Sequence, residues 1–120
     1  MDTILMKYRG ENEEYLVYDT VKYHDVMKAR TVRIICSRGC GAGAAGIMVG
    51  PVNDNGSLTM KMFSPDGEEQ PLGEEAKTAG ACYLKDAGYI RDAAPAGRRA
   101  AVIGKVFLSE DFVSTYMHTA

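Results

Sequence analysis

The feature that most constrains the fold of this chain is a predicted helix with small residues along one side. It covers residues 74–87, and Gly88 follows where a left-handed residue commonly ends a helix. The small residues recur at helical spacing: Ala76, Ala79, Gly80 and Ala87. Because glycine inside a helix costs about 1 kcal/mol relative to alanine, Gly80 indicates a packing requirement. We therefore expect this helix to lie closely against a curved surface.

Segments rich in branched, aromatic or alternating apolar residues predict β-strands elsewhere. The sequence Asn53-Asp54-Asn55-Gly56 is a strong turn signal and predicts a hairpin over residues 47–63. A second hairpin is expected at the N-terminus, and a third near the C-terminus, turning at residues 109–111. The expected strands cover residues 3–8, 15–19, 47–52, 58–63, 100–108 and 112–117.

A shorter helix is predicted over residues 24–36, with Asp25 as its N-cap. Propensity alone would also allow a strand over residues 31–36. The glycine-rich run 39–46 follows, and it lacks the Gly-Lys-Ser/Thr ending of a P-loop. A tight connection between helix and strand is therefore favoured there over a phosphate site.

These elements predict an α+β fold in a single domain covering residues 1–120. About six strands and two helices occur in an order that suggests a strongly bent, barrel-like antiparallel sheet. We expect this sheet to wrap around the central helix 74–87, with the shorter helix beside it. The hydrophobic share of 46% and the charged share of 25% are typical of a globular protein and argue against disorder.

Charge and hydropathy argue against several classes of partner. The net charge is −2 and Arg98-Arg99 is the longest basic run, so nucleic acid is not expected. No apolar run approaches the about 20 residues that span a bilayer, so no membrane association is expected. The residues that follow Met1 lack the basic and apolar regions of a signal peptide, which suggests a cytoplasmic protein.

Three cysteines, Cys36, Cys40 and Cys82, do not form a disulfide framework. Cys36 and Cys40 lie close together, but the two histidines, His24 and His118, are far from them in sequence. Buried or loop thiols are therefore a better interpretation than a metal site. We expect no metal and no cofactor.

Four motifs occur in the order found in one enzyme family. The first is Lys7-Tyr8-Arg9-Gly10-Glu11-Asn12-Glu13-Glu14-Tyr15, which precedes a strand ending in Asp19. Next come Cys36-Ser37-Arg38 and Gly43-Ala44-Ala45-Gly46, and the fourth is Phe63-Ser64-Pro65-Asp66-Gly67-Glu68-Glu69. Together they resemble the N-terminal half of diaminopimelate epimerases, whose fold proline racemases and phenazine-biosynthesis isomerases share.

This resemblance implies a fold, a ligand class and a partner for the chain. Each half of such a bacterial enzyme of lysine biosynthesis wraps a barrel-like sheet around a central helix. The amino-acid substrate lies between the halves, at the facing helix N-termini, and one cysteine from each half acts on its α-carbon without metal or pyridoxal phosphate. The resemblance therefore implies a small amino-acid-like ligand and a partner, which is either a C-terminal half or a second copy in a homodimer.

The sequence departs from the family where the catalytic thiol should stand. The family motif Cys-Gly-Asn-Gly corresponds here to Gly73-Glu74-Glu75-Ala76, and Cys82 lies more than two turns inside the helix. Glu13 and Ser64 replace two asparagines of the family. The favoured hypothesis is a binding or oligomeric half-site without the family's chemistry, whose ligand would contact Ser64, Gly73, Glu74 and Glu75.

Two other hypotheses stay open. The chain could be an active isomerase that uses Glu74, Glu75 or Glu13 in place of a thiol, since carboxylates act as general acids and bases when their environment suits. It could also be a plain protein-interaction module whose acidic helix start meets a partner.

Overall fold

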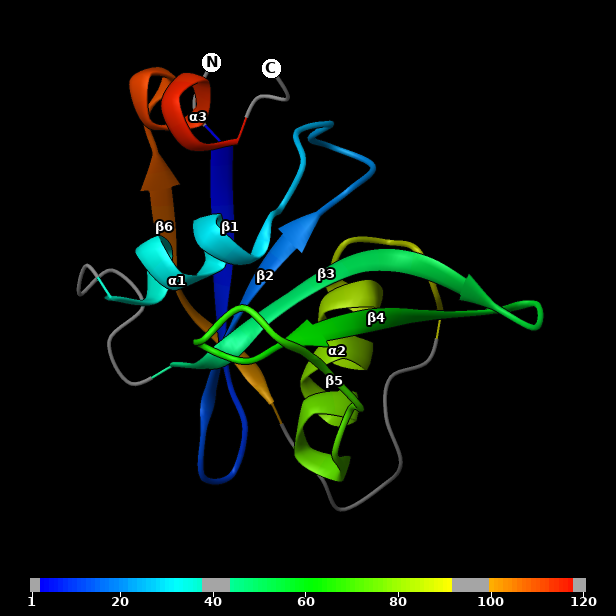
Figure 1. Ribbon diagram of the computed structural model, residues 1–120. Helices are drawn as coiled ribbons and strands as arrows, with labels where there is room; N and C mark the ends of the chain where they lie inside the picture. Colours follow the sequence, from blue (N-terminus) through cyan, green and yellow to red (C-terminus); the bar gives the residue numbers. More distant parts are fainter. Residues whose placement is uncertain (1–2, 38–43, 92–99, 118–120) are drawn as a thin grey trace.

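The computed structural model describes residues 3–37, 44–91 and 100–117 and shows an α+β fold, as the sequence predicts (Figure 1). Six strands form one sheet in the order β5-β4-β3-β2-β1-β6. They are β1 (Thr3–Arg9), β2 (Glu14–Asp19), β3 (Ala44–Asp54), β4 (Ser57–Phe63), β5 (Glu69–Gln70) and β6 (Ala101–Leu108). The helices in these ranges are α1 (Ala29–Ser37), α2 (Glu74–Asp86) and α3 (Glu110–Tyr116).

The sheet is mixed and open, which corrects two expectations. β2 and β3 run parallel, whereas every other neighbouring pair is antiparallel. The parallel pair arises because α1 carries the chain from one strand to the next, and such a crossover joins parallel strands. β5 and β6 are opposite edges of the sheet, so the described strands do not form the predicted barrel.

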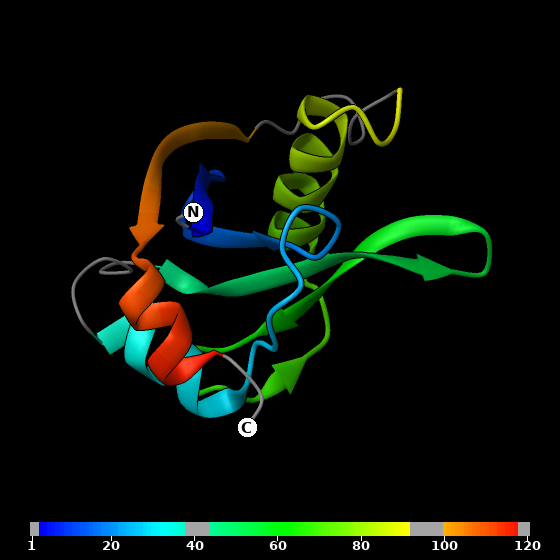
Figure 2. The same ribbon diagram turned by 90° about the horizontal axis from the view of Figure 1, so that it is seen from above.

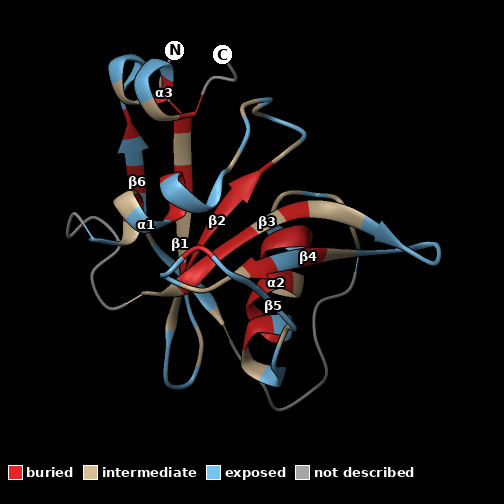
Figure 3. Ribbon diagram, in the orientation of Figure 1, coloured by how far each residue is buried: buried red, intermediate tan, exposed pale blue. Residues whose placement is uncertain are grey.

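Helices cover both faces of the sheet (Figure 2). The core beneath α2 includes Tyr8, Met48, Met60, Ala79 and Tyr83. On the opposite face, α1 and α3 cover a second core, to which β1, β2, β3 and β6 contribute. Figure 3 shows that buried residues gather on β2, on β3 and on the inner side of α2. No helix in the described ranges is long and apolar enough to cross a membrane.

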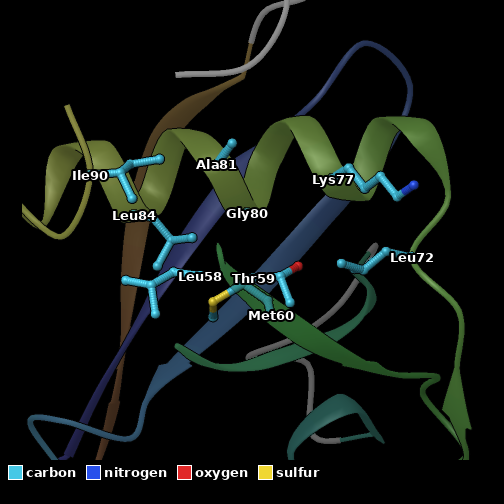
Figure 4. A pocket seen from close by; sticks show the side chains of 9 residues that line it. All are labelled: Leu58, Thr59, Met60, Leu72, Lys77, Gly80, Ala81, Leu84 and Ile90. Carbon is cyan, nitrogen blue, oxygen red and sulfur yellow. The ribbon is translucent and has the colours of Figure 1, made fainter. Parts of the chain in front are cut away.

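The small residues of α2 allow the close packing that the sequence predicts. A Cβ atom on Gly80 would lie 3.1 Å from Cγ of Met60, which is tighter than ordinary contact. Figure 4 shows Gly80 and Leu84 of α2 facing Leu58, Thr59 and Met60 of β4. These residues line a pocket of about 60 Å³. The exposed outer side of α2 means, however, that the helix lies on the sheet and is not enclosed by it.

The end of α2 is as predicted. Gly88 has a φ of +86°, and its N–H donates to the carbonyl of Lys85 at 3.0 Å. The N–H of Tyr89 donates to the carbonyl of Leu84 at 2.8 Å, which completes a Schellman motif. Glycine is required at residue 88 because side chains disfavour this left-handed conformation.

The hairpin of β3 and β4 also confirms its prediction. Asn55 and Gly56 have φ values of 52° and 88°, which is the type I′ turn expected of this dipeptide. Within β3, Gly46 permits close backbone approach, since a Cβ there would lie 2.0 Å from the carbonyl oxygen of Phe63. Most of the glycine-rich run, including Cys40, lies outside the described residues.

Two local predictions need correction. Residues 112–117, expected as a strand, lie within or beside α3. Ser109 caps this helix by accepting a hydrogen bond from the N–H of Phe112 at 3.1 Å, so the polar run read as a hairpin turn is a helix start. α1 begins at Ala29 and not at residue 24, and Asp25 is not its N-cap. Instead, the N–H and the carbonyl of Asp25 both bond to the Tyr18 hydroxyl.

Candidate functional site

A cleft of about 510 Å³ lies at the N-terminal end of α2. All five residues that the sequence singled out lie on it: Glu13, Ser64, Gly73, Glu74 and Glu75. Tyr15, Met62, Pro65 and Pro71 are among the other lining residues. This volume is within the range of about 300–1,000 Å³ that is usual for small-molecule sites. The pocket in Figure 4, at about 60 Å³, is far below that range.

The turn after β4 supplies one wall of the cleft. The N–H of Ser64 donates to the carbonyl of Glu68 at 2.8 Å, and the Ser64 Oγ accepts from the N–H of Glu68 at 3.3 Å. Gly67 has a φ of +88°, and a Cβ there would lie 2.4 Å from the carbonyl oxygen of Ala29. The Asp-Gly sequence of this motif therefore fits both the turn and its contact with the start of α1.

Gly73 precedes α2 as its N-cap, at the position that the resemblance assigns to a catalytic cysteine. Its φ of −75° and ψ of 175° are extended, and no side chain caps the helix there. A Cβ atom built on Gly73 would meet nothing within 4 Å. The backbone therefore does not require glycine, and a side chain at residue 73 would have room.

Glu75 is anchored to the turn between β1 and β2. Its Oε2 accepts hydrogen bonds from the N–H of Asn12 at 3.0 Å and from the N–H of Glu13 at 2.6 Å. Its Oε1 accepts from the side-chain amide of Asn12 at 3.3 Å. These contacts join residues more than sixty positions apart and hold two walls of the cleft together.

The cleft is acidic and contains a phenolic hydroxyl that the sequence reasoning missed. The hydroxyl of Tyr15 donates to Oε2 of Glu13 at 3.3 Å. Burial raises the pKa of Tyr15 far above its usual range, and the carboxylates of Glu75 and Glu13 raise it further. Tyr15 is therefore a protonated donor at neutral pH. Glu13, Glu74 and Glu75 contribute negative charge, and the described lining residues include no lysine, arginine or histidine.

Neither described cysteine lines the cleft. Cys82 packs at the core beneath α2, and Cys36 packs at the core on the opposite face of the sheet. Within the described residues, no three histidine, cysteine or acidic side chains are grouped so that they could hold a metal ion.

A buried polar network fixes the far end of α2. Asp19, only 2% exposed, accepts hydrogen bonds from the hydroxyls of Tyr83 and Tyr89. It also accepts from the N–H groups of Val21 and Lys22. Burial alone would raise the pKa of Asp19, but these four donors hold it below its usual value. The sequence reasoning gave Asp19 no role; an aspartate at the end of an apolar strand is the signal that would have indicated this anchor.

Comparison with known proteins supports the resemblance to one family. No model of a known protein family matches the chain. Diaminopimelate epimerase 2 from Nostoc sp. (strain PCC 7120) is 28% identical over 85 residues. The match covers 70% of this chain but only 30% of the relative, so the matched segment spans less than a third of that protein's length. The resemblance to diaminopimelate epimerases that the motifs indicated is therefore confirmed.

Proposed function

We propose, from this relationship, that the chain is a diaminopimelate-epimerase-like half-site that binds a small amino-acid-like molecule without thiol chemistry of its own. The observation that carries the proposal is Gly73 on the wall of a cleft of about 510 Å³. Neither Cys36 nor Cys82 lines that cleft, so the described part of the chain brings no thiol to it.

The charges of the cleft favour a ligand with an ammonium group. Glu13 and Glu74 both line it, and carboxylates pair with ammonium groups. The first N–H groups of α2 have no partner within the helix, and they favour a carboxylate. A zwitterion such as an amino acid can satisfy both, with its ammonium group toward Glu13 and its carboxylate toward the helix start.

Binding and chemistry can be tested separately. We expect diaminopimelate and 1,5-diaminopentane to shift the NMR signals of residues around the cleft, and glutarate, which has only carboxylates, to leave them unchanged. We expect no exchange of the diaminopimelate α-proton when the chain alone is incubated in deuterated water. Binding of glutarate alone would refute the charge argument, and α-proton exchange would refute the absence of chemistry.

The proposal includes a second chain as a partner. β6 is an edge strand of eight residues that exposes Val102, Ile103 and Phe107, the last by 63%. Long apolar edge strands favour association, and twofold dimers are the commonest form of it. A dimeric mass in sedimentation that Phe107→Lys converts to a monomer would support a homodimer. A monomeric mass at all concentrations would contradict it and leave a separate C-terminal half as the partner.

A second candidate is an isomerase that uses carboxylates. It is favoured by one observation, namely that Glu13 and Glu74 face the same cleft, as an acid and a base on one substrate would. If diaminopimelate α-proton exchange is found, Glu13→Gln and Glu74→Gln should each abolish it. Exchange that persists in both variants would exclude this mechanism.

A further inference from the structure

We propose that Glu75 is a positioning residue, which locks the turn between β1 and β2 onto the start of α2 and so sets Glu13 in the cleft. This inference rests on the cleft's proposed role as a binding site. It assigns different roles to the three acidic residues of the cleft: Glu13 and Glu74 contact the ligand, and Glu75 holds the turn between β1 and β2 in place.

The hydrogen bonds of Glu75 support this division. One carboxylate oxygen, Oε2, accepts from two successive backbone N–H groups, those of Asn12 and Glu13. The other oxygen accepts from the Asn12 side chain. An acid–base group must offer an oxygen to the substrate, whereas both oxygens of Glu75 already face the turn.

The shape of the turn between β1 and β2 independently supports the positioning role of Glu75. Gly10 lies against the Glu75 side chain so closely that a Cβ on Gly10 would be 2.6 Å from Cγ and 2.7 Å from Oε2 of Glu75. The N–H of Gly10 also closes the turn by donating to the carbonyl of Glu13 at 2.8 Å. Glycine at residue 10 therefore provides the space that Glu75 occupies.

The lock determines where the acidic group of Glu13 lies. Asn12 and Glu13 are exposed residues in the turn. Glu75 supplies the hydrogen-bond acceptor that holds their backbone N–H groups. Glu13 in turn accepts from the Tyr15 hydroxyl, and both residues line the cleft. Without Glu75, the turn would lose its tie to α2 and the Glu13 carboxylate would no longer be held beside Tyr15.

The lock can be measured on the free protein by NMR solvent-exchange rates of the Asn12 and Glu13 amides. We expect Glu75→Ala to accelerate both at least tenfold. Glu75→Gln should preserve most of the protection, because its amide oxygen can accept from both N–H groups while the Asn12 side-chain amide turns its oxygen toward the new NH₂ group. Glu74→Ala, which removes a neighbouring charge at the same helix start, should change neither rate.

Gly10→Ala provides a second variant that keeps every charge. Its methyl group would displace Glu75, so it should accelerate the same two amides as Glu75→Ala does. Unchanged rates in both Glu75→Ala and Gly10→Ala would refute the lock. If either variant fails to fold, the amide exchange rates of the other variant are compared with those of Glu74→Ala, and this comparison decides the result.

The effect on the cleft is tested with 1,5-diaminopentane as the probe. Glu75→Gln and Glu75→Ala lose the same charge, so a positioning role predicts at least threefold weaker binding in Glu75→Ala than in Glu75→Gln. Equal binding by the two variants would refute the positioning of Glu13. If the probe binds neither the variants nor the original chain, the proposed ligand class fails, while the exchange rates still decide the lock.

Discussion

Placing a thiol at residue 73 tests both the geometry and the charge of the cleft. Gly73→Cys puts a side chain where a Cβ meets nothing within 4 Å, at a φ of −75° that any residue adopts. Replacing glycine at such a position stabilises by about 0.4–1 kcal/mol through the unfolded chain. Loss of a good N-cap residue offsets this by a similar amount. We therefore expect the free energy of unfolding to change by less than about 1 kcal/mol.

The thiol should also report the sign of the charge around it. A carboxylate about 4 Å away contributes about 1 kcal/mol in water, less in salt, and Glu13, Glu74 and Glu75 all line the cleft. Together they should give a cationic methanethiosulfonate reagent about a tenfold advantage in rate over an anionic one at low ionic strength. The assay is modification followed by mass spectrometry, with the original chain as the control for its three native cysteines.

Two results would refute this reasoning. A loss of more than about 2 kcal/mol in the urea-determined free energy of unfolding would mean that the space at residue 73 is filled. Faster reaction with the anionic reagent would mean that the helix N-terminus outweighs the carboxylates. In that second case, the expected preference for ammonium ligands would also fail.

Three further predictions concern stability, each measured as a free energy of unfolding in urea. Asp19→Asn should cost about 2–3 kcal/mol at pH 7. Because the folded-state pKa of Asp19 is lowered, its contribution to stability is present above the unfolded pKa near 4 and is lost as pH falls through the folded pKa. The free energy of unfolding of the variant should therefore depend less on pH below about 4. Equal acid sensitivity of the two proteins would contradict this. Gly80→Leu should cost about 1–3 kcal/mol because Met60 lies 3.1 Å from the added Cβ. Its control, Ala81→Leu on the partly exposed side of α2, should cost less. Equal losses would exclude close packing at Gly80. Ser109→Ala should cost about 0.5–2 kcal/mol by removing the cap of α3, with Ser114→Ala on the exposed side of that helix as its control; no difference between the two would show that the cap does not matter.

Local chemistry made several elements predictable from the sequence. The turn at Asn55-Gly56 and the helix end at Gly88 depend on backbone conformations that those residues favour on their own. The same reasoning failed at residues 109–117, because Ser109 followed by acidic residues suits both a turn and a helix start. Neighbouring residues did not decide between the two; in the structure the segment forms α3, and Val113 of this helix packs in the core.

The candidate site was predictable in its residues but not in its arrangement. Ser64, Gly73, Glu74 and Glu75 are close together in sequence, and Glu13 was added only through the family motif. Tyr15 was missed because its apolar strand also explains an aromatic residue as core. No local pattern indicates that the Glu75 carboxylate binds a turn more than sixty residues away.

The sequence by itself determined the helix with its small residues, most strands and the glycine-dependent turns. It also showed glycine at residue 73, where the family resemblance implies a cysteine. The tertiary structure alone decided that β2 and β3 run parallel, that the described sheet stays open, and that Glu75 anchors the wall beside Glu13. The physical reason is that conformational preference acts between neighbouring residues. Strand pairing and side-chain anchoring join distant residues, and their energies depend on how the whole core packs.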